Sequence, residues 1–286
     1  MYPLKKSSQR KSFVFLLCCA ISTLIISCKG GTFEVPSPEE FTKANREELG
    51  EIIYSTILQT NQFQLLPNLP PYDTSVYWYV QTLYNQATLS LRLDNQSPSS
   101  NRWNQTRNWK VNIIQDDNLK IAFTIPGGYL FISTGLLKLF KEDFELYYVL
   151  SFEGILMNDR YLLTRMIEEY NSLTLINILQ GKATATEISK KIVAEELPTL
   201  VFDSNIVRDL DSKTVQDICE SSIFERQGIV PLLNNYSKNE VDWLRTRETY
   251  SARADEIPFY STENGLICGE VRNTGKYQQY VLDILP

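Results

Sequence analysis

Apolar residues along most of this chain recur at intervals of three and four, the spacing that places side chains on one face of a helix. This pattern is clearest over residues 75–93 and continues over most of residues 151–179. An earlier helix is expected to begin at Ser37, where Ser-Pro-Glu-Glu forms a capping signal. Further helices are expected at 184–196, 206–224, 230–236 and 241–247. The sequence therefore predicts a mostly helical protein.

Short β-rich runs interrupt the helical pattern in the middle of the chain. They cover residues 109–115, 119–125 and 129–133, and the last two are joined by Pro126-Gly127-Gly128. Two glycines permit the positive φ angles that a tight reversal needs. Thr134-Gly135-Leu136-Leu137 then opens a short helix, and an apolar helix follows. A small sheet or hairpin beside a helix, within a mostly helical chain, predicts the α+β class.

The first 27 residues have the composition of an export signal. Lys5, Lys6, Arg10 and Lys11 are followed by the apolar run FVFLLCCAISTLIIS, with no acid before Cys28. A spanning helix needs about 20 apolar residues, so residues 1–27 favour a cleaved signal peptide over an uncleaved anchor, which stays the alternative. The sequence before Cys28 also resembles a bacterial lipobox. It therefore predicts an exported lipoprotein, anchored through palmitate or a similar lipid on Cys28 to a bacterial membrane and facing the periplasm or the cell surface.

Residues 28–38 read as a short Gly- and Pro-containing tether, and residues 39–286 are expected to form a single domain. Loss of residues 1–27 removes four bases and no acid, so the net charge changes from −6 to −10. An acidic domain without a basic stripe argues against a nucleic-acid partner.

Cysteine usage leaves two thiols in the predicted domain. Cys18 and Cys19 lie in the signal and Cys28 would carry lipid, so Cys219 and Cys268 remain. In an exported protein such a pair is a candidate disulfide. Two buried free thiols are the alternative, because nothing local fixes the distance between them.

Residues 144–161 read FELYYVLSFEGILMNDRY and follow the layout EL-x-x-VL-x-HE-x-x-H-x-x-x-RH without a gap. In that layout two histidines four residues apart hold Zn²⁺, and the Glu between them polarises a bound water. Here Phe152 and Leu156 stand at the histidine positions and Glu153 at the Glu position. Phe and Leu have no lone pair to donate, and the chain contains no His.

The ordered series of motifs resembles the zinc metallopeptidase family of the CAAX prenyl protease and HtpX, in particular its exported lipoprotein branch. The resemblance implies a zincin-type, mostly helical α+β domain with a small sheet beside the motif helix. The segment from Arg208 to Asp211 resembles the approach to the third-ligand helix, and residues 247–257 resemble the closing element, with Arg253 at its Arg. The matching positions are Ala122-Phe123, Pro126-Gly127-Gly128, Thr134-Gly135-Leu136-Leu137, Glu145-Leu146, Val149-Leu150, Glu153 and Arg160.

The resemblance also implies that the zinc ligands are lost. The family's E-A-D element falls on Lys213-Thr214-Val215, and an alternative alignment puts Val215 at the ligand position, so either placement loses the Glu. We therefore expect no zinc and no other cofactor, with Phe152 and Leu156 filling the old metal cavity as core. Glu153 would be a vestigial general base, paired with a base such as Arg160 or Arg208, or else a residual ligand or catalytic group.

The sequence thus predicts a catalytically inactive, metallopeptidase-like lipoprotein. An edge strand can accept a peptide as an added strand without any metal, so a peptide or an envelope protein is expected to bind the hairpin from Ile121 to Ser133. Two alternatives stay open: an active metalloendopeptidase with a non-standard metal site, and a structural or assembly role in the envelope.

Overall fold

The computed structural model describes residues 41–70, 75–89, 109–181, 184–221, 224, 228–239, 241, 243, 245–246, 248–263, 268 and 275–285. They belong to the compact unit Pro36–Pro286. The predicted signal peptide, the predicted lipidation site Cys28, the whole tether and the expected helix start at Ser37 lie outside the described residues. No helix in the described part of the chain is both long enough and apolar enough to cross a bilayer.

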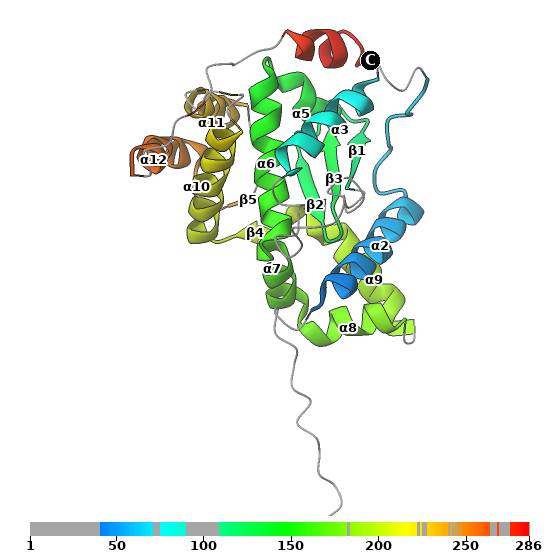
Figure 1. Cartoon of the computed structure of the whole chain (residues 1–286). Coiled ribbons are helices and arrows are strands. Elements are labelled where there is room, and N and C mark those ends of the chain that lie inside the picture. The colour runs from blue at the N-terminus through cyan, green and yellow to red at the C-terminus, as the bar shows by residue number, and fades with distance from the viewer. Residues whose placement is uncertain are drawn as a thin grey trace, which may run out of the picture. The chain divides into compact units, whose positions relative to one another are not determined.

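The centre of the fold is a three-stranded mixed sheet with the order β1-β3-β2 (Figure 1). β1 (Lys110–Ile114) runs parallel to β3 (Tyr129–Ser133), and β2 (Ala122–Ile125) runs antiparallel to β3. The β2–β3 turn depends on glycine: Gly128 has a φ of 92°, and a Cβ there would lie 2.2 Å from the ring of Trp109. The strands lie within the runs that the sequence predicted, and the α+β class is confirmed.

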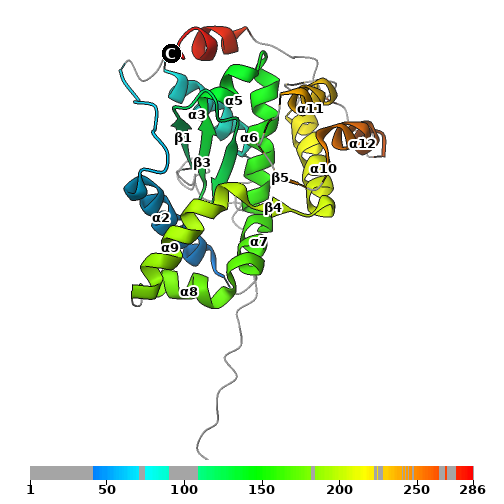
Figure 2. The same ribbon diagram turned by 180° about the vertical axis from the view of Figure 1, so that it is seen from behind.

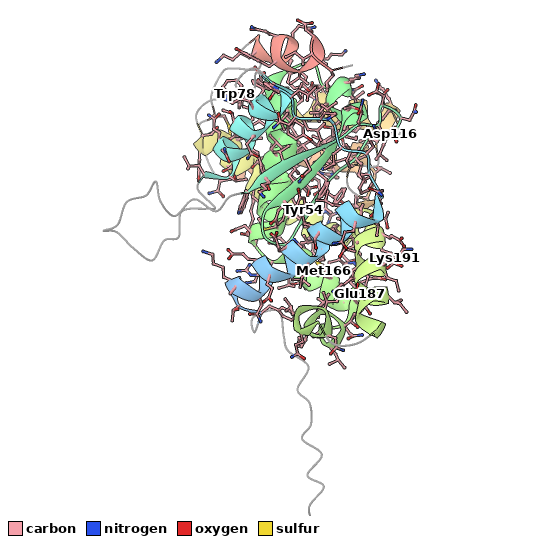
Figure 3. The ribbon with its side chains drawn as sticks, turned by 90° about the vertical axis from the view of Figure 1, so that its right-hand side faces the viewer. Tyr54, Trp78, Asp116, Met166, Glu187 and Lys191 are labelled. Carbon is pink, nitrogen blue, oxygen red and sulfur yellow. A yellow bond between two sulfur atoms is a disulfide. The ribbon has the colours of Figure 1, made fainter. Side chains whose placement is uncertain are left out.

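Helices cover both faces of this sheet because adjacent strand residues point to opposite sides. Thr124 of β2 faces α6 (Asp143–Asn158), and its hydroxyl bonds to a side chain of that helix. Its neighbour Phe123 stacks on Phe131 on the other face. There α2 (Lys43–Thr60) packs, with the ring of Tyr54 4.4 Å from that of Tyr129 (Figure 3). α3 (Val76–Ala87) lies along the outer edge of β1 and packs on α6.

The motif helix α6 is anchored at its start by a capping box, in which Glu142 and Glu145 satisfy each other's backbone N–H groups. Nearly every residue of α6 is buried, because β2 and α3 pack on one side and α10 (Ser204–Glu220) on the other (Figure 1). α10 in turn packs on α12 (Tyr250–Glu263). The motif helix is therefore the central helix of the described fold.

The remaining elements surround this centre. They are α5 (Thr134–Leu139), α7 (Tyr161–Tyr170), α8 (Ser172–Gln180), α9 (Thr184–Glu196), the 3-10 turn η3 (Leu197–Thr199), β4 (Val201–Phe202), α11 (Ile229–Lys238), β5 (Arg245–Thr246) and the π-helical turn η4 (Gln278–Leu282). Figure 2 shows α8 and α9 below the sheet and α9 leading upward into β4. Cys219, near the end of α10, is joined to Cys268 by a disulfide.

Two element predictions were wrong or incomplete. Residues 241–247 were expected to be helical, but they contain a bend and β5, which pairs in parallel with β4. The buried positions Val241 and Trp243 are two residues apart, a spacing typical of extended chain. α12 was not predicted, and the Pro258 that it contains is a residue that normally argues against a helix interior.

Candidate functional site

Glu153 lies in the middle of α6 with 1% of its surface exposed. Its Oε2 accepts a hydrogen bond from the Thr124 hydroxyl at 2.9 Å, and its Oε1 accepts one from the Trp243 indole N–H at 3.0 Å. Thr124 belongs to β2, and Trp243 lies two residues before β5. The carboxyl group therefore joins the sheet to a segment near the C-terminal end of the chain.

Neither partner of Glu153 was anticipated from the sequence. The sequence suggested that a base such as Arg160 or Arg208 pairs with Glu153. For Arg208 this prediction was wrong, because Arg208 pairs with Glu248 and Glu256 instead. Burial raises the pKa of Glu153 to about 7, and the bonds from Thr124 and Trp243 oppose this rise only in part. The group is therefore a carboxylic acid that titrates near neutral pH.

The two histidine positions of the motif are filled by hydrocarbon. Phe152 is fully buried and Leu156 is 3% exposed. The Phe152 ring centroid lies 5.0 Å from that of Trp243 and 6.3 Å from that of Tyr148. Both side chains are buried, as expected from the sequence for residues that fill the former metal cavity as core.

A buried ion pair packs against the ring of Phe152. The guanidinium of Arg253 binds Asp211 through two hydrogen bonds of 2.9 and 2.8 Å, and both side chains are buried. The Tyr148 hydroxyl also donates to Asp211, at 2.6 Å. The guanidinium carbon of Arg253 lies 5.3 Å from the Phe152 ring centroid. Burial alone would lower the pKa of Arg253, but the carboxylate of Asp211 holds this pKa above its ordinary value.

Comparison with known proteins gives this arrangement a family. The model of peptidase family M48 matches residues 85–239, more than half of the chain, and the match includes the sheet, α6 and α10. The chain belongs to peptidase family M48. The search of the curated proteins found no match.

Lys213, which the sequence placed at the third ligand position, bonds to neighbouring side chains. The ammonium of Lys213 lies 2.9 Å from a carboxylate oxygen of Asp159 and 2.7 Å from the Tyr161 hydroxyl, at the C-terminal end of α6. Val215, the alternative, is fully buried.

A further register for this position was not considered from the sequence. Asp209-Leu210-Asp211 has the acid-x-acid spacing of E-A-D, which would put Asp209 at the ligand. The carboxylate of Asp209 pairs with Lys213, at 3.1 Å, and accepts a bond from Tyr161. Even in this register Phe152 and Leu156 supply no donor, and only one of the three ligand positions carries an oxygen.

The residues present do not fit the zinc ion of an M48 peptidase. The chain has no His, and within the described ranges no group of three or more His, Cys, Asp or Glu comes together. Two of the ligand positions carry buried hydrocarbon, and the positive charge of Arg253 lies next to one of them.

The outer edge of β1 is hydrogen-bonded by neighbouring segments. The amide side chain of Gln81 accepts from the backbone N–H of Val111 and donates to the carbonyl of Trp109, both at 3.0 Å. The N–H of Ile113 donates to the Tyr77 hydroxyl, and its carbonyl accepts from the N–H of Leu66. This edge is therefore closed to an added strand.

The outer edge of β2 is different. A backbone bond from Ser133 to Ile121 fixes the alternation of the antiparallel ladder, so Ala122 and Thr124 direct their N–H and C=O groups away from β3. In the described part of the chain, no backbone–backbone bond joins these groups to another segment, but the N–H of Thr124 hydrogen-bonds to the carboxyl group of Glu153. They face a cleft of about 290 Å³, a volume that includes its opening to solvent, lined also by Glu153 and Leu156.

A second cleft, of about 370 Å³ including its opening to solvent, lies at the β2–β3 turn. Pro126, Gly127, Lys43 and Arg46 line it, and Leu162 lines both clefts. The hairpin named from the sequence therefore borders two clefts, one beside Glu153 and one at the turn.

Proposed function

We propose that this member of family M48 is a non-catalytic binding module, anchored to a bacterial membrane through lipid on Cys28, that captures a peptide or an envelope protein at the hairpin from Ile121 to Ser133. The observation that carries the proposal is the combination of a filled metal site with a strand edge that, in the described residues, has no partner strand on its outer side. Phe152 and Leu156 occupy the histidine positions of the motif helix with buried hydrocarbon. Ala122 and the carbonyl of Thr124 direct backbone groups away from β3, at an edge that borders the cleft.

Loss of the metal removes most of the catalytic effect. Zinc lowers the pKa of bound water from 15.7 to about 7 and polarises the scissile carbonyl. A general base acting alone contributes about 10²- to 10⁴-fold, far less than peptide hydrolysis requires. The carboxyl of Glu153 is moreover engaged by Thr124 and Trp243.

Strand addition needs only backbone N–H and C=O groups at a sheet edge, with side-chain contacts for selectivity. The β2 edge supplies the backbone groups and the cleft supplies apolar walls. Because β1 is closed by Gln81 and Tyr77, β2 is the edge of this sheet that favours such a partner.

Export and lipidation are supported by the sequence of residues 1–27 and by Cys28. The disulfide between Cys219 and Cys268 agrees with an oxidising compartment. Metabolic labelling with palmitate should mark the wild-type protein, and Cys28→Ala should abolish the label. Undiminished labelling of that variant would contradict anchoring at Cys28.

Photo-crosslinking tests the binding site. Benzoylphenylalanine placed at Phe123, which lines the cleft, should capture a partner in cells of the source organism. The matched control is the same substitution at Phe259 on α12, which is 62% exposed. Crosslinks from position 259 alone would place the partner elsewhere and would refute the proposal.

Retention of Glu153 beside a cleft favours one competing function, an active peptidase with a non-standard metal site. That function requires peptide cleavage that a chelator suppresses and that Glu153→Gln abolishes. Such a result would overturn the proposed binding role.

A further inference from the structure

The cleft beside β2 has a second wall made by the chain itself. We call residues 197–202 the wall segment; it contains η3 and β4 and connects α9 to α10. Leu197, Pro198, Leu200 and Phe202 are buried and line the same cleft as the outer edge of β2. The wall segment therefore fills most of the apolar side of the groove.

The spacing between the two walls leaves no room for a further strand. Cα atoms of β2 and η3 lie within 8 Å of each other. A strand inserted between them would need about 4.8 Å on each side, or roughly 10 Å in all. In the described conformation, the wall segment stands where an added strand would lie.

The wall segment covers β2 without hydrogen-bonding to it as a strand. Its own polar groups bond locally: the N–H of Leu200 donates to the carbonyl of Leu197, and the Thr199 hydroxyl donates to the carbonyl of Glu196. Pro198 has no N–H to offer. The segment thus supplies apolar side chains to the groove, while in the described residues the N–H and C=O of Ala122 and the C=O of Thr124 make no backbone bond on the outer side of β2. The N–H of Thr124 is held by Glu153.

We propose that the wall segment is an internal occupant of the binding groove, displaced by an extended partner whose apolar side chains replace those of Leu197, Leu200 and Phe202 while its backbone pairs with β2. This inference rests on the proposed function, because it assumes that the β2 edge receives the partner. It adds the class of partner, an extended apolar segment, and the element that must move.

Two contacts hold the wall segment in place. Arg165 of α7 donates from Nε to the carbonyl of Val201 at 2.6 Å, and β4 pairs with β5. Arg165 also pairs with Glu169 at 2.6 Å on its own helix. Substitution of Arg165 should therefore loosen the wall segment without altering any residue of the cleft.

The test is a binding titration with a defined probe. The probe is a fluorescein-labelled peptide, Glu-Leu-Val-Thr-Leu-Val-Phe-Asp, which copies residues 196–203 with Val in place of Pro198 so that every backbone N–H is available. Arg165→Ala should raise its affinity about tenfold, because a larger fraction of molecules has the groove open. Glu169→Ala is the matched control: it removes the ion pair but keeps the bond to Val201, so its affinity should stay within about twofold of wild type.

Hydrogen exchange gives an independent readout without ligand. Amides of residues 197–202 should exchange about tenfold faster in Arg165→Ala than in Glu169→Ala, since exchange follows local opening. Equal exchange together with equal affinity in the two variants would overturn the inference.

The failure of this inference can be told from failure of the proposed function. If the probe binds all variants equally well and competes with crosslinking from position 123, the edge is a binding site and the wall segment is not its competitor. If no variant binds the probe while crosslinks from position 123 persist, the assigned partner class is wrong. If crosslinks from position 123 are also absent, the proposed function itself fails.

Discussion

At the scale of single residues, Glu153 stands at the Glu position of the M48 motif and is buried, in the described part of the chain, among side chains that carry no charge partner for it. Its hydrogen-bond donors, the hydroxyl and N–H of Thr124 and the indole N–H of Trp243, are neutral, and neutral donors stabilise a carboxylate less than a cation does. Arg253 and Asp211 lie next to Phe152, and their opposite charges largely neutralise each other. Burial therefore dominates, and the raised pKa follows from desolvation.

Glu153 should make stability depend on pH. Its pKa is about 7 in the folded protein and 4.5 ordinarily, so the folded state holds the proton more tightly. Its contribution to the free energy of unfolding is full below pH 4.5 and is lost as the pH rises through 7, by on the order of 3 kcal/mol. Glu153→Gln stays neutral, so urea unfolding should show the variant gaining stability relative to wild type over this range. A constant difference between pH 4.5 and 7.5 would contradict the assignment.

Phe152 should behave as a core residue. Phe152→His introduces a polar ring into a fully buried apolar site and should lower the free energy of unfolding by about 1–3 kcal/mol. Phe259→His on the surface of α12 is the control and should change it by less than about 0.5 kcal/mol. Equal melting temperatures for the two variants would mean that position 152 is accessible to water.

At the scale of elements, long-range contacts join the C-terminal segments to the motif helix. Trp243 reaches Glu153 on α6, and Arg253 of α12 reaches Asp211 of α10. The disulfide adds a covalent connection from α10 to residue 268. Segments distant in sequence therefore hold α6 in place together with the sheet.

The disulfide should contribute to this arrangement. Cys219 and Cys268 are 49 residues apart, and closing a loop of that size stabilises a protein by about 2–4 kcal/mol. Cys219→Ala with Cys268→Ala should lower the free energy of urea unfolding by that amount. Reduction should have the same effect on wild type and none on the double variant. If reduction destabilises the double variant equally, the effect does not come from this bond.

At the scale of the whole molecule, the proposed loss of the metal predicts how the stability of the protein responds to added zinc. A ligand that binds the folded state raises the melting temperature by mass action. Since the described site offers no ligand set for zinc, neither added zinc nor a chelator should change the melting temperature, and mass spectrometry of the purified protein should find no stoichiometric zinc. An increase of several degrees with equimolar zinc would contradict this expectation.

Much of the fold followed from local pattern. Residues 75–93 were expected to be helical and α3 is Val76–Ala87; α9 and β3 have the predicted bounds. The sequence predicted the turn at Pro126-Gly127-Gly128 because glycine permits the positive φ angles that this turn contains. Residues 241–247 were misread because a short apolar run fits a helix or an extended chain equally well, and only pairing with β4 decides between them.

The sequence by itself determined which donor atoms exist: a chain without His, with Phe152 and Leu156 at the motif positions, has no imidazole to bind a metal ion whatever its fold. Only the tertiary structure decided that Trp243 bonds Glu153 across 90 residues, that Arg253 pairs with Asp211, and that residues 197–202 stand against β2. The reason is physical: local spacing sets the conformation of a segment, whereas these contacts arise when separate apolar faces pack together and leave each buried polar group to find the partner within reach.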